Sequence, residues 1–394
     1  MSNTPAPPDA PAPVDLLATS AYDYDLPEAL IATAPTPTPS QARMMVVPPE
    51  GALRHASFED LPELLRPDDL LVFNDTKVLP VRIHARKDTG GRVEVFVLRV
   101  GDPRVADARA QDWVRPAAPG VVRLWGMTRT SKPLRNGQQL IPEADTSLHL
   151  RVIDAQPGRA LVEVDWDQSP EALMEHLGQL PLPPYIVRQR KERGEAALTA
   201  QDAQDYQSIF ARHAGAVAAP TASLHFDAPL MERLRLRGVR HTFVTLHVGA
   251  GTFKPVDADR LLDHPMHSEQ YVLSEDACEA LAQAKRSGAR VIAVGTTCAR
   301  VLEAQARAPE GIVPTSASTD IFLHPHNRLQ YCDGLITNFH LPRSTLLALV
   351  AAAMGYERMR QVYAQAIEHA YRFYSYGDGM FISPLLRPTH EDAP

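Results

Sequence analysis

The chain has few cysteines and no long apolar run. Its three cysteines, Cys278, Cys298 and Cys332, are widely spaced, which argues against a disulfide framework or a thiolate zinc site, because both need paired cysteines. No apolar run approaches the roughly 18 residues that would span a bilayer. The proline-rich start lacks the basic-then-apolar order of a signal peptide. We therefore expect buried free thiols, a disordered tail at residues 1–17 and a cytoplasmic protein.

Several catalytic signatures are also absent. The chain contains no Gly-x-Ser-x-Gly elbow and no Walker A sequence, so serine hydrolase and P-loop chemistry have no support. The closest histidine pairs lie in His264-Pro-Met-His267 and His324-Pro-His326. Each pair encloses a proline, and neither has the helical H-E-x-x-H spacing or the cysteine partner that zinc sites use. We therefore predict no metal site.

The charge balance is mildly acidic. A formal net charge of −7 argues weakly against a polyanionic partner, because phosphate binding relies on basic side chains. Two local clusters of basic residues point the other way, one at residues 188–193 and one spread over residues 77–92. From charge alone, a solvated face explains either cluster better than a nucleic-acid contact does.

Residues 77–165 have the pattern of β-strands. Apolar and polar residues alternate in four runs, at residues 78–86, 92–99, 148–153 and 160–166. A period of two indicates strands with one buried face. The turn Asp88-Thr-Gly-Gly91 joins the first two runs as a hairpin, and Gln156-Pro-Gly-Arg159 joins the last two. About six strands without an intervening helix predict a small β-barrel.

From about residue 215 onward, strand-like and helical segments alternate. Strands are predicted at residues 243–248, 290–294 and 335–339, and helices at 274–287, 298–306 and 344–355. Such alternation is typical of an α/β fold with a parallel sheet, and Leu70-Leu-Val-Phe73 fits a buried strand of that same sheet. We predict a large α/β catalytic domain with a mostly parallel sheet at residues 18–76 and 172–394, and an inserted six-stranded β-barrel domain at residues 77–171.

Two apolar runs each end in a histidine. The first is Gly215-Ala-Val-Ala-Ala-Pro-Thr-Ala-Ser-Leu-His-Phe226, and its small residues let a backbone or a ligand approach closely. The second begins at Phe243 and ends at His247. We interpret both runs as strands that deliver His225 and His247 to one site.

The second run continues into a Gly-x-Gly turn at Gly249 and Gly251, followed by Thr252. Lys254 stands where G-x-G-x-x-G needs its third glycine, and Pro255 follows where a helix should begin, so a dinucleotide site is rejected. What remains is a turn that is either purely structural or brings backbone N–H groups to a small ligand.

Two later strands also end in polar residues. Gly295-Thr-Thr297 opens a helix, where the two threonine hydroxyls either cap the helix or bind a ligand. Asn338, His340 and Arg343 follow the next strand and exceed what capping requires. In a parallel sheet these residues would share one edge with His225 and His247, outside the carboxyl ends of the strands, where open α/β sheets bind ligands.

The segment Tyr371-Arg-Phe-Tyr-Ser-Tyr-Gly-Asp-Gly-Met-Phe381 gathers aromatic residues around two charges. Exposed, its tyrosines would stack on bases, and buried, they would belong to the core. The sequence leaves both interpretations open.

Ten ordered sequence blocks between Tyr22 and Ile382 resemble those of one known protein family. They include Phe73-Asn-Asp-Thr-Lys-Val-Leu-Pro-Val-Arg82, the two histidine runs, Val294-Gly-Thr-Thr297 and Thr337-Asn-Phe-His-Leu-Pro342. In these blocks the chain resembles the S-adenosylmethionine:tRNA ribosyltransferase-isomerases of queuosine biosynthesis. Three features depart from the family: Ser223 stands where glycine is more usual, Gly379 where alanine is expected, and the segment 102–119 is longer.

The resemblance implies a reaction and an architecture. The ribosyl part of S-adenosylmethionine is transferred to 7-aminomethyl-7-deazaguanine at the tRNA wobble position and isomerised, which gives epoxyqueuosine and releases adenine and methionine. S-adenosylmethionine is then a substrate, and no cofactor is expected. The implied partner is that tRNA, with no membrane contact, and the implied protein is a monomeric α/β enzyme whose barrel has Greek-key topology.

The resemblance also implies roles for residues. The sulfonium acidifies the neighbouring ribose hydrogens, so His225 and His247 are candidate bases, and His340 or Asp378 would assist the departure of adenine. Gly295, Thr296 and Thr297 would bind the methionine or ribose end, and Asn338 and Arg343 a carboxylate or phosphate. The predicted substrate-binding set is Asn74, Asp75, Thr76, Thr221, Gly249, Gly251, Thr252, Gly295, Thr296, Thr297, Asn338, Arg343 and Tyr376.

The tRNA contact is expected on the barrel and on the basic stretch. The predicted tRNA-binding residues are Arg188, Arg190, Lys191 and Arg193. Tyr374 or Tyr376 would stack on a base of the single-stranded loop. Two alternatives are a non-catalytic tRNA-binding protein with a barrel surface and a metal-dependent hydrolase that uses the histidines.

Overall fold

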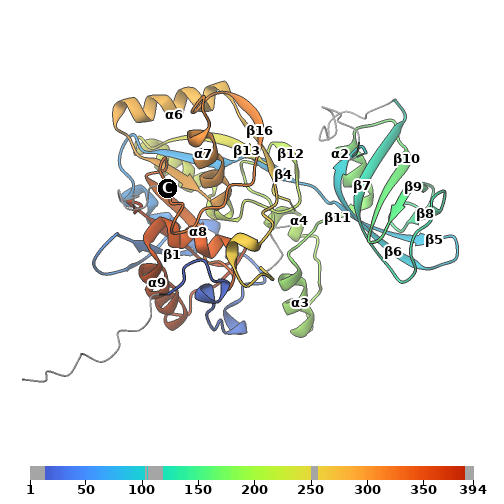
Figure 1. Cartoon of the computed structure of the whole chain (residues 1–394), viewed down its shortest axis with the longest axis horizontal. Coiled ribbons are helices and arrows are strands. Elements are labelled where there is room, and N and C mark those ends of the chain that lie inside the picture. The colour runs from blue at the N-terminus through green and yellow to red at the C-terminus, as the bar shows by residue number, and fades with distance from the viewer. Residues whose placement is uncertain (1–13, 103, 105–118, 250–255, 387–394) are drawn as a thin grey trace, which may run out of the picture.

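Two bodies of unequal size make up the protein (Figure 1). The computed structural model describes residues 14–102, 104, 119–249 and 256–386. The larger body holds a sheet flanked by helices, and the smaller is a β-barrel that extended segments join to it. The predicted combination of an α/β part with a β-barrel is confirmed.

The nine strands of the larger sheet have the order β16-β14-β13-β3-β15-β17-β18-β1-β2. The four central strands, from β13 to β17, run parallel. Antiparallel pairs occur toward both edges, so the sheet is mixed, whereas a mostly parallel sheet was predicted. The strands are β1 (Arg43–Val47), β2 (Arg54–Ser57), β3 (Leu70–Asn74), β13 (Arg240–Leu246), β14 (Glu269–Leu273), β15 (Val291–Val294), β16 (Thr315–Thr319), β17 (Gly334–Asn338) and β18 (Gly379–Ile382).

The central strands are apolar along their whole length because both of their faces are covered. Successive residues of β3 enter different cores: Leu70 and Val72 pack in one hydrophobic cluster, and Leu71 and Phe73 in another. The helices supply the rest of these cores. They are α1 (Leu61–Leu64), α5 (Ala228–Leu236), α6 (Glu275–Ser287), α7 (Thr296–Arg307), α8 (Thr345–Met354) and α9 (Tyr356–Glu368), with α3 (Pro184–Glu192) and α4 (Asp202–Asp205) nearer the barrel.

Helix α6 shows how local sequence sets the limits of a helix. The Ser274 hydroxyl accepts a hydrogen bond from the Ala277 backbone N–H at the start. Gly288 ends the helix in the left-handed conformation, with φ of 73°, which glycine adopts without steric penalty. The predicted helix at 274–287 therefore matches the observed one.

The small body is a closed antiparallel barrel. Its strand order is β5-β6-β7-β10-β9-β8, and a pairing of β5 with β8 closes it. The long connection from β7 to β8 lets β10 return beside β7, which is Greek-key topology. The strands are β5 (Arg82–Lys87), β6 (Arg92–Val100), β7 (Val121–Thr130), β8 (Gln139–Pro142), β9 (Leu150–Gln156) and β10 (Arg159–Asp165).

One helix packs onto the barrel core. In α2 (Pro170–Leu177), Leu173, Met174 and Leu177 are buried in the same cluster as the inward side chains of the barrel strands. The two-residue strand β11 (Gly178–Gln179) then pairs with β5. The proposed domain limits of 18–76 with 172–394, and 77–171, stay a prediction.

The run that ends at His225 is not a strand. Strand β12 covers only His213–Ala216 and pairs in parallel with β4 (Thr76–Val78). After Pro220 the chain forms the 3-10 helix η5 (Thr221–His225). The prediction of a strand delivering His225 is therefore wrong, because Pro220 removes a backbone donor and turns the chain.

The three cysteines are buried free thiols, as predicted. Over the described ranges, no helix is long and apolar enough to cross a membrane. Within the same ranges, no cluster of three or more histidine, cysteine, aspartate or glutamate side chains is arranged to hold a metal ion.

The Gly215→Ala change is expected to destabilise the protein. Gly215 has a φ of 152°, and an added Cβ would lie 2.7 Å from Nδ1 of His247, so either backbone or imidazole must move. We expect the free energy of unfolding in urea to fall by about 1–3 kcal/mol. Gly249→Ala is the control, because its Cβ would meet nothing within 4 Å. Equal losses in both variants would contradict the close packing of Gly215 on His247.

Candidate active site

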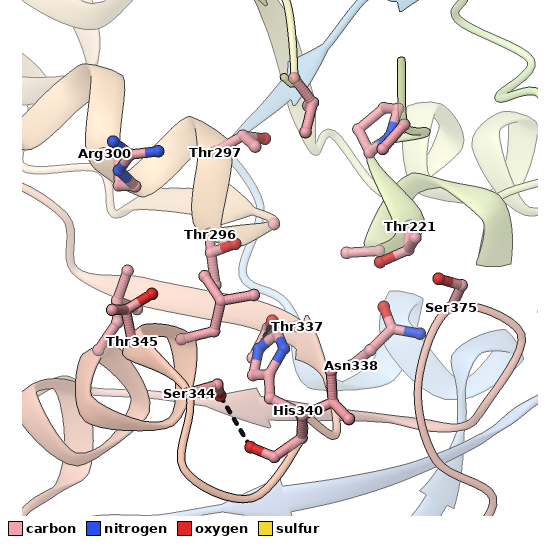
Figure 2. A pocket seen from close by; sticks show the side chains of 18 of the residues that line it. Thr221, Thr296, Thr297, Arg300, Thr337, Asn338, His340, Ser344, Thr345 and Ser375 are labelled. Carbon is pink, nitrogen blue, oxygen red and sulfur yellow. Dashed lines mark hydrogen bonds between the residues drawn. The ribbon is translucent and has the colours of Figure 1, made fainter. Parts of the chain in front are cut away.

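A pocket lies at the carboxyl ends of the central parallel strands (Figure 2). It encloses about 1390 Å³, part of it open to solvent. Its walls come from the turns after β15 and β17, the first turns of α7 and α8, the segment 218–222 and the turn at 374–375. Predicted residues on these walls are Thr221, Gly295, Thr296, Thr297, Asn338 and His340.

The turn from β15 into α7 forms one wall. Gly295 has a φ of 97° and serves as the N-cap, without a side-chain capping bond. Thr296 and Thr297 are the first two residues of the helix and line the pocket. Capping therefore does not account for the two threonine hydroxyls, although Thr297 Oγ1 accepts a hydrogen bond of 3.3 Å from Asn74.

Asn338, the last residue of β17, is held by its amide nitrogen. Its Nδ2 donates to the backbone oxygen of Tyr374 at 3.0 Å and to Nε2 of His225 at 3.2 Å. Both amide protons are thus engaged, so Asn338 has no donor left for the carboxylate or phosphate that was predicted there.

His225 lies behind Asn338 and is not among the described residues that line the pocket. Its ring stacks on Phe58 with a centroid distance of 4.1 Å. Burial, followed by the nearby positive charge of Arg372, lowers the pKa of His225 to about 3. The neutral imidazole accepts a hydrogen bond from the Asn338 amide and so fixes the orientation of that amide. Because His225 does not line the pocket, its position does not support a role as the catalytic base.

His340 lies on the pocket wall. Its Nε2 forms a 2.9 Å hydrogen bond with Thr337 Oγ1, and its backbone N–H donates to the hydroxyl of Tyr363. Burial lowers the pKa of His340 to about 4. The ring is therefore neutral near pH 7, and burial makes it a weaker proton acceptor than an exposed imidazole.

His247 follows β13 but faces away from this pocket. Its Nδ1 is 2.8 Å from Thr76 Oγ1, and its ring packs against Gly215. Burial, with His213 nearby, lowers the pKa of His247 to about 4. The neighbouring residue Val248 lines the pocket instead, because successive residues of an extended segment point to opposite sides.

The predicted trio Asn74, Asp75 and Thr76 is internal. Asn74 bonds to Leu246 N and O, and Asp75 Oδ1 accepts a 2.6 Å hydrogen bond from the Thr245 hydroxyl. Burial raises the pKa of Asp75. The three residues are not on the pocket wall, and direct contact with substrate is not supported for them.

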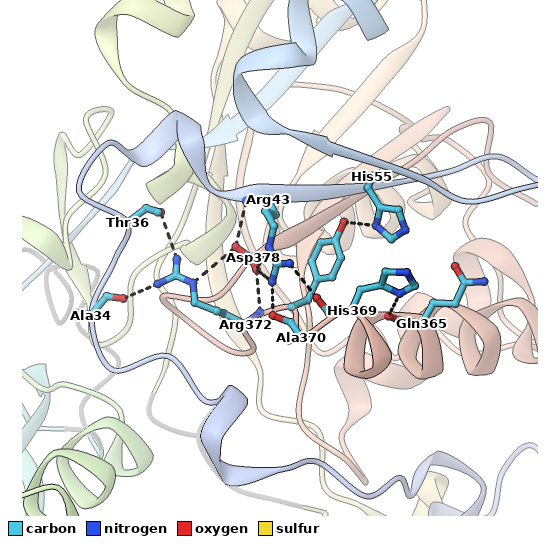
Figure 3. A network of polar contacts seen from close by, with 10 residues as sticks. Ala34, Thr36, Arg43, His55, Gln365, His369, Ala370, Arg372 and Asp378 are labelled. Carbon is cyan, nitrogen blue, oxygen red and sulfur yellow. Dashed lines mark hydrogen bonds and ion pairs between the residues drawn. The ribbon is translucent and has the colours of Figure 1, made fainter.

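Asp378 belongs to a separate polar network (Figure 3). Its carboxylate accepts four hydrogen bonds, three from Arg43 and one from the backbone of Arg372. The side chain is 2% exposed and is absent from the pocket wall. Asp378 therefore shapes the turn that carries Tyr374 and Ser375 to the pocket, and the prediction of a proton donor there is not supported.

Other predicted ligands lie elsewhere. Arg343 is near Asp23, at 3.8 Å, and off the pocket wall. Tyr376 is buried against Tyr206, which excludes base stacking by its ring. The Gly249 backbone N–H donates to Glu269 at 3.1 Å. Gly251 and Thr252 lie outside the described residues.

The basic residues at 188–193 differ in their exposure to solvent. Arg188, Lys191 and Arg193 are exposed. Arg190 is only 6% exposed, pairs with Asp202 at 2.7 Å and donates to the Thr33 carbonyl. The prediction that Arg190 binds tRNA is therefore wrong, because its guanidinium is enclosed and satisfied.

The structure also brings in residues that sequence patterns missed. Arg300 lines the pocket one helical turn after Thr296 and pairs with the buried Glu269. Tyr185 and Ser375 meet at another wall, where the Tyr185 hydroxyl donates to Ser375 Oγ at 2.6 Å. The i, i+4 spacing of Thr296 and Arg300 was a readable signal of a shared helix face.

Comparison with known proteins identifies the class of this protein. The queuosine biosynthesis protein family matches residues 19–382, and the chain belongs to that family. A relative from Pelobacter propionicus, named S-adenosylmethionine:tRNA ribosyltransferase-isomerase, is 44% identical over 362 residues, which are 92% of this chain and 98% of the relative. The resemblance stated from the sequence blocks is confirmed.

A solved structure from Thermotoga maritima, titled S-adenosylmethionine tRNA ribosyltransferase, is also similar. It is 28% identical, with a TM-score of 0.49, and the match covers 92% of this chain and 99% of that one.

Stability is expected to fall on acidification. His225 has a folded pKa of about 3 against an ordinary 6.5, so below about pH 6.5 the unfolded chain binds a proton that the folded chain does not. Its contribution is complete above that pH and is lost progressively toward pH 3. His225→Gln keeps a neutral acceptor for Asn338 and should flatten the fall of unfolding free energy in urea between about pH 7 and 5. Identical pH slopes in both proteins would contradict the buried neutral imidazole.

Arg190→Ala is expected to destabilise the fold and not merely to weaken tRNA binding. Removing this guanidinium leaves Asp202 buried without its partner, which should lower the free energy of unfolding by about 3–5 kcal/mol. Arg188→Ala is the matched control, since that side chain is 64% exposed and its loss should cost less than about 1 kcal/mol. Urea denaturation compares the two, and similar small losses would refute the structural role.

Proposed function

We propose that this chain is an S-adenosylmethionine:tRNA ribosyltransferase-isomerase. It transfers and isomerises the ribosyl moiety of S-adenosylmethionine onto 7-aminomethyl-7-deazaguanine at the tRNA wobble position, and it releases adenine and methionine. The observation that carries this proposal is the 44% identity to a relative of that name over nearly its whole length. We also propose that it acts as a cytoplasmic monomer without a cofactor.

The pocket suits the small-molecule substrate. Its apolar walls, among them Ala218, Ala219 and Ala222, leave room for flat rings beside a few polar groups. The hydroxyls of Thr296 and Thr297, at the start of α7, provide donors for the methionine or ribose end. Arg300, paired with Glu269, lies one turn further along the helix. Small side chains at 218–222 thus have the function of leaving space.

His340 is our candidate for proton transfer. The sulfonium of S-adenosylmethionine acidifies the hydrogens on the ribose 5′ carbon, and a neutral imidazole can remove one. Of His225, His247 and His340, His340 is the one on the pocket wall. Its bond to Thr337 Oγ1 fixes the ring orientation. We propose that the same imidazole, once protonated, assists the departure of adenine.

The tRNA is proposed to contact exposed basic residues. Arg188 and Lys191 lie on α3, a helix of the larger body (Figure 1), and Arg193 follows its last residue. Phosphate contacts from such side chains hold the anticodon stem-loop without reading its sequence. A non-catalytic tRNA-binding protein and a metal-dependent hydrolase are less favoured, because the 44% identical relative is named as a transferase.

The decisive assay follows adenine. The protein is incubated with S-adenosylmethionine and tRNA carrying 7-aminomethyl-7-deazaguanine, and released adenine and the mass of the modified base are measured by chromatography and mass spectrometry. Adenine release that depends on this tRNA is expected. Methylated tRNA, or no change in the tRNA, would refute the proposed reaction.

His340→Gln should slow adenine release by about 10²- to 10⁴-fold, the usual range for removing a general base. Binding of S-adenosylmethionine, measured by calorimetry, should change far less, because glutamine keeps the size and polarity of the side chain. His326→Gln, at an exposed histidine, is the control and should keep full activity. A loss in His340→Gln that comes entirely from weaker binding would rule out the proton-transfer role.

A further inference from the structure

One pocket residue has an acceptor that nothing in the described structure satisfies. Asn338 Oδ1 is buried and has no hydrogen-bond partner among the described residues. The amide cannot turn round to hide this oxygen, because Nδ2 donates to the Tyr374 carbonyl, which only accepts, and to His225 Nε2. In Figure 2 the oxygen points toward the side chains of Thr221 and Ser375.

An unpaired buried acceptor is costly, and shielding from water increases the gain when a partner arrives. A ligand that brings an N–H donor to this oxygen therefore gains affinity, and a ligand that brings a carboxylate is repelled. This reverses the chemistry expected for Asn338 from the sequence.

A donor lies beside this acceptor. Ser375 Oγ accepts the Tyr185 hydroxyl proton, and a serine hydroxyl also has one proton of its own to donate. An acceptor next to a donor complements a base edge that has an amino group next to a ring nitrogen. The alanine-rich wall at 218–222 and Tyr374 provide apolar surfaces for such a ring.

The opposite side of the pocket presents hydrogen-bond donors. The hydroxyls of Thr296 and Thr345 stand there, at the first turns of α7 and α8, and Arg300, which is paired with Glu269, follows one turn later in α7 (Figure 2). The hydroxyls and the positive ends of the two helix dipoles favour an anionic group, whereas the charge of Arg300 is already balanced by Glu269. A molecule with a carboxylate at one end and an amino-substituted purine at the other matches both sides at once.

We propose that Asn338 Oδ1 accepts a hydrogen bond from the 6-amino group of the adenine of S-adenosylmethionine, with His225 as the positioning residue that fixes the amide. This inference rests on the proposed function and adds the orientation of the substrate: adenine at the Asn338 side and the methionine carboxylate at the opposite side, beside the hydroxyls of Thr296 and Thr345. The ring N–H of the deazaguanine in tRNA offers the same chemistry and is the competing source of the donor.

The test compares S-adenosylmethionine with its analogue that has hydrogen in place of the 6-amino group. Calorimetry on the unmodified protein without tRNA should show about 10- to 100-fold weaker binding of the analogue, since an unsatisfied buried acceptor costs about 1–3 kcal/mol. Asn338→Ala should bind the two compounds equally well. Thr345→Ala, on the opposite side of the pocket, should lower both affinities by one factor and keep their ratio.

Equal binding of the two compounds by the unmodified protein overturns the proposal, and this outcome needs no variant to fold. Discrimination that persists in Asn338→Ala also overturns it, because the amino group is then read elsewhere. An Asn338→Ala variant that weakens only tRNA binding assigns the donor to the tRNA base and overturns it as well. Absence of adenine release from S-adenosylmethionine in the presence of the modified tRNA would instead refute the proposed function.

Discussion

The fully buried side chain of Asn74 ties together the edge of the sheet on which the site depends. Its amide oxygen accepts from the backbone N–H groups of Leu246 and Thr76, and its amide nitrogen donates to the Leu246 carbonyl and to Thr297. Four elements, β3, β4, β13 and α7, are thereby held at their ends. Because backbone groups at strand ends have no partner in the sheet, a side chain with two donors and two acceptors is well suited to satisfy them.

A second buried polar group does the same for the opposite wall. Asp378 holds Arg43 and the backbone of Arg372, and the turn between Arg372 and Asp378 carries Tyr374 and Ser375. Tyr374 in turn accepts from Asn338. Asn74 and Asp378 thus position side chains that face the pocket, although neither residue lines it. The sequence blocks shared with the family therefore contain both residues that line the pocket and residues that hold those in place.

Much of the fold was predictable because its signals are local. Caps and periodicity located α6, and the turns at 88–91 and 156–159 defined two barrel hairpins that the structure confirms. The strands β14, β16 and β18 were not predicted, since strands of four or five residues show little periodicity. The mixed character of the sheet depends on strand pairing, which no local pattern encodes.

The site was only partly predictable. The strand-end rule correctly placed Thr296, Asn338 and His340 at one pocket, because the carboxyl ends of parallel strands converge. The same rule could not tell that His247 faces the other way or that His225 stands one layer behind. Side-chain direction depends on packing against distant residues, here Gly215 and Phe58.

By itself, the sequence determined the residue types, the elements with strong local signals and the family. Tertiary structure alone decided which polar groups are left without a partner at the pocket and which form hydrogen bonds or ion pairs inside the fold. Arg190 and Asp378 are charged residues that sequence reasoning places on a substrate, yet each is enclosed by partners far away in the chain. The physical reason is that hydrogen-bond satisfaction depends on all the neighbours of a group, and folding supplies most of them from long range.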